Sequence, residues 1–446
     1  MTDIATPVVP YRIFRKTFNP KKLISLFNDK ISSTKAVGRD GVRVEKFAEK
    51  LNDEVALIVR KASDGKYKFT KYKLKLVSKG VGKIPRVLSI PTVRDRLALR
   101  AMCEFLSTIF PDAVTKKPHS YIKAIRESLN SLDDSAVFLR IDVKDYYPSI
   151  DRTVLESIIR KRIRKRQARD IIMAAVSTTT TGGDDSGIPQ GLSISNILAG
   201  IYLRDFDIYA EGRWKYFRYV DDILIICKDT NEADKAYQEI SKKLLAEKKL
   251  QCHPISENGK SCIKKVTDGV DYLGYTVSKN MISVREASYK NIFPKILSVL
   301  TYHRHHKDEA KLIWRLNLKI SGCIFNGKNF GWMFFFMQTK NTSQLVNLDR
   351  FVKSQLSKRG LDHVTPKIKT FVKSYHEMRY KYMTTKYIIN FDKFNIEDKV
   401  EAIILLSGEP LSVFDNMTDK EISQRFYKVI GKEVSELEKD VMEFFS

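Results

Sequence analysis

The sequence is poor in cysteine, and its few cysteines do not form short paired motifs. Five occur in 446 residues, and none belongs to a CxxC pair. This spacing supports neither a zinc-binding module nor a disulfide framework. We therefore expect reduced, mostly buried thiols and a cytoplasmic protein. The five are Cys103, Cys227, Cys252, Cys262 and Cys323.

Long hydrophobic runs are also lacking. The most apolar patch, GWMFFFM, is far too short to cross a bilayer. The N-terminal stretch MTDIATPVVPYRIF has no basic region followed by a long apolar segment, so it does not read as a signal peptide. No membrane partner is expected from these features.

Acidic residues are scarce relative to basic ones. The chain has 53 Asp and Glu against 79 Lys and Arg, which gives a formal net charge of +26 at pH 7. A compact chain this basic repels itself unless a polyanion neutralises it. Nucleic acid, bound through its phosphates, is the simplest such partner, and an anionic membrane surface is the rival.

The order of hydrophobic patterns predicts a mixed chain of more than one domain. Residues 42–62 carry a helical apolar stripe, and residues 66–91 alternate basic with apolar residues, as expected for two strands joined by a turn. Residues 136–143 form a short strand-like run. Residues 151–166 predict one helix, with Asp151 as its N-cap.

The later segments continue this alternation and then become helical. Residues 193–212 predict a buried helix, residues 232–250 an amphipathic helix and residues 270–278 a further strand. From about Tyr289 the chain is mostly helical and basic, and beyond Phe391 its charge balance shifts toward acidic.

Two adjacent aspartates interrupt the apolar segment FRYVDDILIIC. The flanking runs predict a β-hairpin with Asp221 and Asp222 at its turn, where the carboxylates need not be buried in hydrocarbon. Hard divalent cations, chiefly magnesium, suit such a pair of oxygen ligands.

A third carboxylate, Asp142, ends the strand at residues 136–143. If that strand lies beside the hairpin, the three acids converge. Such a set can hold two metal ions about 3.5–4 Å apart, which is the geometry for in-line phosphoryl transfer. We expect two Mg²⁺ ions, with Mn²⁺ as a substitute: one would activate a primer 3′-hydroxyl, and the other would hold the triphosphate and the leaving pyrophosphate.

Three segments resemble, in order, the core motifs of reverse transcriptases: DVKDYYPSI, GIPQGLSISN and YVDD. KIPRVLSIPTVRDRLALRAM resembles the fingers segment of that family, GRDGV resembles an N-terminal motif shared with group II intron enzymes, and YLGY resembles the primer-grip region. The resemblance covers roughly residues 38–275. A single YxDD is weak, whereas the ordered set is specific.

The resemblance implies an α+β fold, a right-hand polymerase with fingers, a palm of antiparallel sheet plus helices, and a helical thumb. The implied segments are the N-terminal segment and fingers (1–135), the palm with the catalytic core (136–285), the thumb (286–390) and a C-terminal helical extension (391–446).

The same resemblance implies roles for individual residues. Asp142, Asp221 and Asp222 would be catalytic and metal-binding, although in related enzymes the residue at Asp222 supports more than it coordinates. Tyr147 would exclude a ribose 2′-hydroxyl by steric clash and so select deoxynucleotides. The nucleotide-binding set is Arg86, Tyr147, Gln190, Asp145 and Lys79, with Lys83 as the rival of Lys79.

One part of the nucleotide pocket departs from the family pattern. Family members often read Ser-Pro where this chain has Ser195-Asn196. A basic stretch, RKRIRKRQAR, is expected on one helix face and is a candidate for phosphate binding. The nucleic-acid-binding candidates are Arg160, Lys161, Arg162, Arg164, Lys165 and Tyr219.

The thumb region RLNLKISGCIFNGKNFGWMFFFMQTKN resembles that of the bacterial defence-associated reverse transcriptases, with the class-two type as the nearest match. The chain lacks the NAxxH and VTG elements of retron enzymes and any evident ribonuclease H or HNH-like module. The resemblance implies an enzyme that copies a partner noncoding RNA into cDNA from deoxynucleoside triphosphates, in antiphage defence. Template-independent or protein-primed synthesis and a non-catalytic RNA-binding scaffold are the alternatives; the oligomeric state is open.

Overall fold

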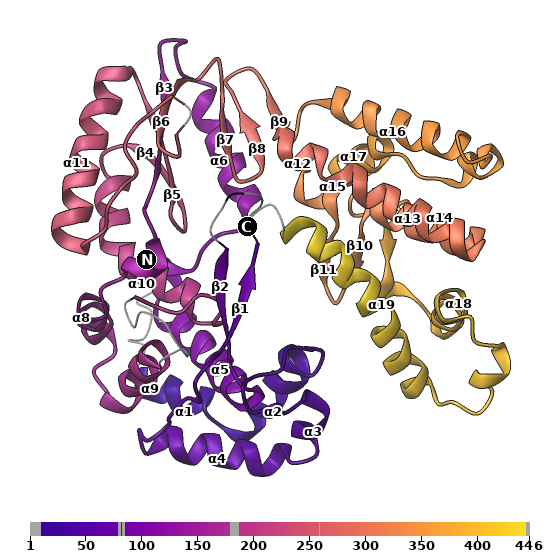
Figure 1. Cartoon of the computed structure of the whole chain (residues 1–446), viewed down its shortest axis with the longest axis horizontal. Coiled ribbons are helices and arrows are strands. Elements are labelled where there is room, and N and C mark those ends of the chain that lie inside the picture. The colour runs from indigo at the N-terminus through magenta and orange to yellow at the C-terminus, as the bar shows by residue number, and fades with distance from the viewer. Residues whose placement is uncertain (1–9, 79–81, 83–84, 179–186, 258, 443–446) are drawn as a thin grey trace, which may run out of the picture. The chain divides into compact units, whose positions relative to one another are not determined.

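The computed structural model describes residues 10–78, 82, 85–178, 187–257 and 259–442. The chain divides into two compact units (Figure 1). The first comprises Met1–Lys116 and Ser135–Lys264, and the second comprises Lys117–Asp134 and Lys265–Ser446.

The first unit begins with helices α1 (Pro10–Thr17), α2 (Pro20–Leu26), α3 (Val44–Ala48) and α4 (Leu51–Ser63), the hairpin β1 (Lys73–Val77) and β2 (Arg86–Ile90), and α5 (Val93–Ile109). It continues with β3 (Val137–Asp142), α7 (Tyr146–Ser149), α8 (Arg152–Arg162), α9 (Arg166–Ser177), α10 (Ser195–Glu211), β4 (Lys215–Tyr219), β5 (Asp222–Cys227), α11 (Thr230–Lys248) and β6 (Cys262–Lys265). Short turns of helix lie at η1 (Phe27–Ile31) and η2 (Pro111–Ala113).

The second unit contains α6 (Pro118–Leu129), β7 (Val270–Tyr272), β8 (Tyr275–Val277), β9 (Ile282–Val284), α12 (Glu286–Lys290), α13 (Ile292–His306), α14 (Glu309–Ser321), β10 (Cys323–Phe325), β11 (Lys328–Phe330) and α15 (Trp332–Phe335). It ends with α16 (Thr342–Ser357), η3 (Asp362–Lys367), α17 (Phe371–Tyr380), β12 (Ile389–Asn390), η4 (Phe391–Lys393), α18 (Ile396–Ser407), η5 (Leu411–Phe414) and α19 (Asp419–Met442).

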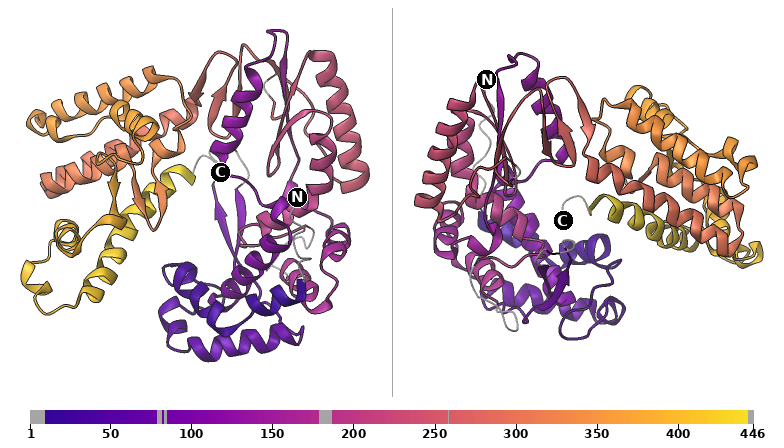
Figure 2. Two further views of the ribbon diagram at one scale, coloured as in Figure 1. Left: turned by 180° about the vertical axis from the view of Figure 1, so that it is seen from behind. Right: turned by 45° about the horizontal axis from the view of Figure 1, so that its top comes forward.

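A four-stranded sheet, in the order β4-β5-β3-β6, is the frame of the first unit. The strand β5 pairs antiparallel with both β3 and β4, and its residues 223–227 are buried. Helix α11 packs against β3 and β5 (Figure 1). Helices α1 to α4 gather at the opposite end of this unit, as the two views in Figure 2 also show. The predicted α+β class, with an antiparallel sheet and helices, is confirmed.

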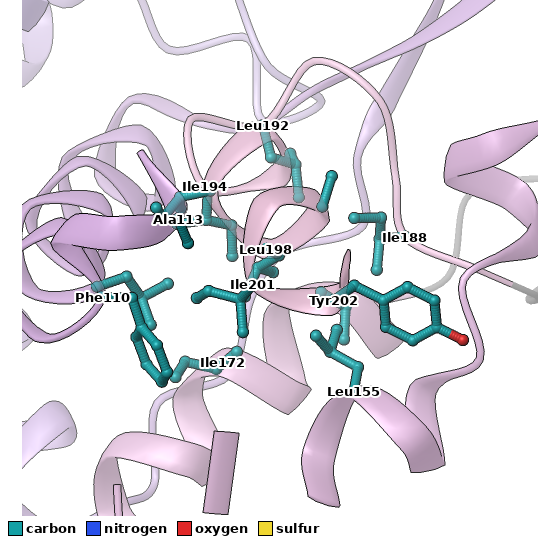
Figure 3. Close-up of a cluster of buried hydrophobic side chains, with 14 of the residues drawn as sticks. Phe110, Ala113, Leu155, Ile172, Ile188, Leu192, Ile194, Leu198, Ile201 and Tyr202 are labelled. Atoms are coloured by element: carbon teal, nitrogen blue, oxygen red, sulfur yellow. The ribbon is translucent and has the colours of Figure 1, made fainter. Parts of the chain in front are cut away.

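Helix α10 is the central helix of this unit, and it is buried along most of its length. Leu198, Ile201 and Tyr202 pack with side chains from η2, α8, α9 and the loop before α10 (Figure 3). The Tyr202 hydroxyl donates a hydrogen bond to the Lys248 carbonyl at 2.6 Å, which joins α10 to the end of α11. Burying this helix fixes the elements that surround the hairpin.

Most predicted elements are present. The segment at residues 66–91 contains the antiparallel pair β1 and β2, and residues 136–143 contain β3. The hairpin predicted around Asp221 is β4 with β5. Asp151 caps α8, since its carboxylate accepts hydrogen bonds from the backbone N–H groups of Thr153 and Val154.

Three predicted elements are wrong because each contains a break. The helix predicted at 42–62 is divided into α3 and α4. The helix predicted at 151–166 ends at Arg162, because Ile163 takes an extended conformation and its side chain is fully buried. The strand predicted at 270–278 is the hairpin β7–β8, whose turn residues Leu273 and Gly274 have φ of 50° and 83°.

The C-terminal segment of the second unit packs on the preceding helices. Phe391, Ile403, Phe426 and Ile430 share one hydrophobic core with Cys323 and other residues of the 314–330 region. Arg315 on α14 also pairs with Glu433 on α19 at 2.7 Å. The GWMFFFM patch is core, since Trp332, Met333, Phe334 and Phe336 are buried. Among the described residues, no helix is both long enough and apolar enough to cross a bilayer.

A buried ion pair joins α10 to the β4–β5 hairpin. The Arg218 guanidinium donates to both carboxylate oxygens of Asp207, at 2.7 and 2.5 Å, and each side chain is only 9% exposed. Tyr216 donates to the same carboxylate at 2.9 Å. Arg218 also donates to the Val220 carbonyl at 2.8 Å, so the pair holds the turn of the hairpin.

We predict that Asp207→Ala lowers the free energy of unfolding by about 3–5 kcal/mol, because it leaves the Arg218 charge buried without its partner. Asp170→Ala is the matched control. Its partner Arg166 is 85% exposed, so a change below about 1 kcal/mol is expected. Urea unfolding of both variants measures the difference. Equal destabilisation of the two would contradict the structural role of the buried pair.

Candidate active site

The turn of the β4–β5 hairpin consists of two residues, Val220 and Asp221, and places Asp221 at one end of the strands. Val220 has a φ of 58°, which is costly for a β-branched residue. Asp142, at the end of β3, pairs in register with Asp222, the first residue of β5. The three acids predicted to converge therefore lie at the same end of the sheet, where β3 ends and β5 begins.

Asp221 feels the charge of its neighbours. Burial, and then the charges of Asp142 and Asp222, raise the pKa of its carboxyl to about 6, while a backbone hydrogen bond and Arg86 act in the opposite direction. Burial and like charges both disfavour the ionised form of an acid. A bound cation would offset both effects.

Asp222 forms an ion pair with an arginine of the neighbouring strand. The Arg140 guanidinium donates to its two oxygens at 2.8 and 2.9 Å, in a bidentate pair. Although burial opposes the charge of Arg140, the Asp222 carboxylate raises the pKa of that guanidinium. The side chain of Asp222 is therefore held by Arg140, which lies two residues before Asp142 on β3.

Asp142 lies beside two basic side chains. Its Oδ2 is 3.5 Å from the Lys260 Nζ and 3.4 Å from the His253 Nε2. Its backbone is also fixed, because its N–H donates to the Ser261 hydroxyl at 3.1 Å and its carbonyl accepts from the His253 N–H at 2.9 Å. The loop after α11 thus positions this carboxylate.

The residues present fit a divalent cation at Asp142 and Asp221. Both are carboxylates, the ligand type that Mg²⁺ prefers, and the charge of Asp142 contributes to the raised pKa of Asp221. Among the described residues, no group of three acids, histidines or cysteines has metal-binding geometry. Asp222 as a third metal ligand stays a prediction; in the structure, Arg140 donates to both of its carboxylate oxygens.

Tyr147 lies on α7 next to the first turn of α10. Its hydroxyl donates to the Asn196 Oδ1 at 2.5 Å. The pKa of the phenol is raised, first by burial and then by the charge of Asp221, while the charge of Arg86 lowers it. Tyr147 therefore lies within electrostatic reach of both Asp221 on the β4–β5 hairpin and Arg86 on β2.

The GIPQG loop packs against Tyr147 from the other side. The Ile188 N–H donates to the Tyr147 carbonyl at 2.9 Å. Gly187 has a φ of 68°, and a Cβ there would lie 2.3 Å from that same carbonyl oxygen, so only glycine fits. The Gln190 carbonyl accepts from the Ser89 N–H at 2.7 Å, which places Gln190 beside β2, where Arg86 also lies.

Asp145 and Lys79, predicted to bind the nucleotide, and Tyr219, predicted to bind nucleic acid, differ in how the structure places them. Asp145 precedes α7 in a left-handed conformation, with a φ of 42°. Tyr219 pairs in register with Asp222. Lys79 and Lys83 lie outside the described residues.

The basic stretch does not form one helix face. It spans the end of α8, the buried Ile163 and the start of α9. Arg162 makes a bidentate pair with Asp112 at 2.8 and 2.9 Å, and Lys161 lies 3.6 Å from Asp205. Lys165 lies over the Tyr11 ring, and Arg160 and Arg164 are exposed.

Sequence reasoning missed two arginines that hold the site, Arg140 and Arg218. Both interrupt strands that are otherwise largely apolar, FLRID and YFRYV, and this is the signal that could have found them. A charged residue inside a buried strand needs a partner. Here each partner is an aspartate of the hairpin or of α10.

Comparison with known proteins agrees with the order of these motifs. Residues 77–277 match the family described as "Reverse transcriptase (RNA-dependent DNA polymerase)". Protein YkfC of Escherichia coli K12 is 22% identical over 379 residues, which cover 71% of this chain and 94% of that protein. Group II intron-encoded protein LtrA of Lactococcus lactis is 24% identical over 194 residues, or 41% of this chain and 32% of LtrA. This chain therefore matches about a third of the length of LtrA.

Solved structures of telomerase show weaker likenesses. Telomerase from Candida albicans, in complex with a fragment of telomeric RNA, has a TM-score of 0.40 at 14% identity and covers 86% of this chain and 67% of its own. Apo telomerase from Candida tropicalis has a TM-score of 0.41 at 12% identity, with 89% and 74% covered.

We predict that Asp221 makes the stability of the metal-free protein depend on pH. The raised pKa means that the folded protein keeps a proton that the unfolded chain has released between about pH 4 and pH 6. The stability contributed by this proton is fully present below that window and is lost as the pH rises through 6. Urea unfolding in a chelator should show a smaller loss between pH 5 and pH 7.5 for Asp221→Asn than for the wild type. An identical loss in both proteins would rule out the coupling.

Proposed function

We propose that this chain is an RNA-directed DNA polymerase that joins deoxynucleotides by two-metal nucleotidyl transfer, a proposal supported by the match of residues 77–277 to the reverse transcriptase family. The observation that carries the proposal is the closeness of two acids at one end of the four-stranded sheet, where the charge of Asp142 helps to raise the pKa of Asp221.

Asp142 and Asp221 would hold two Mg²⁺ ions, for which Mn²⁺ could substitute. Bound there, the ions would supply Lewis acidity and stabilise charge on the reacting phosphate. Asp222, held by Arg140, would fix the start of β5, and Arg218 would fix the turn through the Val220 carbonyl. Lys260 and His253 would hold Asp142 in place.

The remaining residues would bind and select the nucleotide. Arg86 would pair with the triphosphate, because a planar and permanently charged fork suits phosphate oxygens. Gln190 and the adjacent loop would shape the pocket from the side of β2. Tyr147 would fill the space that a ribose 2′-hydroxyl needs, so that deoxynucleotides enter. Asp145, Tyr219, Lys79 and the exposed Arg160 and Arg164 remain candidates for nucleotide or nucleic-acid contacts.

For the whole chain we propose a division into fingers up to residue 135, palm at 136–285, thumb at 286–390 and a C-terminal extension at 391–446. The net charge of +26 favours an RNA partner, bound through its phosphates. The thumb resemblance supports a finer proposal: a cytoplasmic bacterial enzyme that copies a partner noncoding RNA into cDNA, in defence against phage.

We predict that Asp142→Asn and Asp221→Asn each reduce DNA synthesis by roughly 1,000-fold or more, because each would weaken metal binding worth several kcal/mol to the transition state. Asp234→Asn, an exposed acid on α11, is the matched control and should keep wild-type activity. Primer extension on an RNA template with Mg²⁺ is the measurement. Full activity in the two site variants would refute the two-metal proposal.

The products distinguish the alternatives. The purified protein, with any RNA that accompanies it, is incubated with Mg²⁺ and deoxynucleotides, and the products are sequenced. Products complementary to the RNA support templated copying. Products unrelated to that RNA, or attached to the protein, would favour template-independent or protein-primed synthesis. Survival of phage-exposed cells that carry the wild type or Asp221→Asn tests the defence role.

We predict that Tyr147→Ala raises ribonucleotide incorporation relative to deoxynucleotide incorporation by about 10-fold or more, because the ring would no longer occupy the space of the 2′-hydroxyl. The ratio of kcat/KM for matched ribonucleotides and deoxynucleotides measures this. An unchanged ratio would show that Tyr147 has no part in sugar selection.

A further inference from the structure

The first turn of α10 holds two parts of the nucleotide pocket through adjacent side chains. The buried Ser195 donates its hydroxyl to the Pro189 carbonyl at 2.6 Å and so holds the GIPQG loop. The next residue, Asn196, accepts the hydroxyl of Tyr147 at 2.5 Å. One helical turn therefore sets the loop and the aromatic ring relative to each other.

The Tyr147 ring is held at both of its ends. At the backbone, its carbonyl accepts from the Ile188 N–H at 2.9 Å. Beside it, the Tyr146 ring lies with its centroid 5.7 Å away, and the Tyr146 hydroxyl is anchored on the Ala199 carbonyl at 2.6 Å. The hydroxyl end of the Tyr147 ring is fixed by Asn196.

We propose that Asn196 is a positioning residue for sugar selection, which acts by fixing the Tyr147 ring through this hydrogen bond. The inference rests on the proposed function, in which the ring excludes the 2′-hydroxyl. Exclusion of a single hydroxyl depends on where the ring edge lies, and an aromatic side chain has two rotatable bonds through which that edge moves. A hydrogen bond at the far end of the ring restricts both.

Asn196 stands where members of the resembling family often have proline, and the proposed hydrogen bond gives this difference a role. A proline at residue 196 would have no side-chain acceptor for the Tyr147 hydroxyl, whereas asparagine has one. Asn196 is the second residue of α10, where the backbone N–H has no partner within the helix and most residues are tolerated. The side chain is therefore free to serve the pocket rather than the helix.

The test is a double-mutant cycle with single-nucleotide incorporation. Asn196→Ala removes the acceptor, Tyr147→Phe removes the donor and keeps the ring, and the double variant removes both. Asn196→Asp keeps an acceptor oxygen at the same position and serves as the conservative control. For each protein, kcat and KM are measured separately with a matched ribonucleotide and deoxynucleotide.

Each single variant should raise the ribonucleotide-to-deoxynucleotide ratio of kcat/KM by about 2- to 10-fold, the worth of one hydrogen bond. The change should fall mainly in the KM for the ribonucleotide. The double variant should show no further rise, and Asn196→Asp should keep the wild-type ratio.

Three results would overturn the proposal. These are an unchanged ratio in Asn196→Ala, a parallel fall of both kcat/KM values, as a purely structural role would give, and independent, multiplying effects in the double variant. Failure of the proposed function gives a different signature. If the wild type incorporated no deoxynucleotide, the polymerase assignment itself would be wrong. If Tyr147→Ala kept the wild-type ratio of ribonucleotide to deoxynucleotide kcat/KM, the ring would have no role in sugar selection, and Asn196 would have none either.

Discussion

Repulsion between carboxylates at one end of the β4-β5-β3-β6 sheet is the constraint around which the first unit is organised. Asp142 and Asp221 lie together at that end, and the pKa of Asp221 is raised to about 6 by burial and by its acidic neighbours. The protein offsets the repulsion with fixed cations: Arg140 pairs with Asp222, and Lys260 lies beside Asp142. A divalent cation at Asp142 and Asp221 would complete this balance.

Helix α10 connects this electrostatic arrangement to the hydrophobic core. Its buried face packs against neighbouring helices, and three of its polar residues hold parts of the site: Asp207 holds the hairpin through Arg218, while Ser195 and Asn196 hold the GIPQG loop and Tyr147. A well-packed helix thereby fixes the groups to which we assign nucleotide selection in the proposed function. Changes in the core around α10 should therefore act on fidelity as well as on stability.

The sequence was sufficient to predict the β4–β5 hairpin, the strand that carries Asp142 and the N-cap at Asp151, because each depends on local pattern. It was not sufficient for breaks that depend on tertiary packing. Ile163 leaves the helical conformation as its side chain enters the core, and the Leu273-Gly274 turn requires positive φ at a leucine that no local rule favours. The pairing of Asp222 with Arg140 is also invisible in sequence, because the two residues lie 82 positions apart and the chain between them must fold before their side chains meet.

The most direct test of the metal assignment is Mn²⁺ binding, measured by electron paramagnetic resonance for the wild type, Asp221→Asn and Asp222→Asn. We expect Asp221→Asn to abolish binding at the site. Asp222→Asn should weaken it by only about 10- to 100-fold, as expected for a residue that supports the ligands without coordinating. The reverse order, with binding lost in Asp222→Asn and kept in Asp221→Asn, would contradict the account.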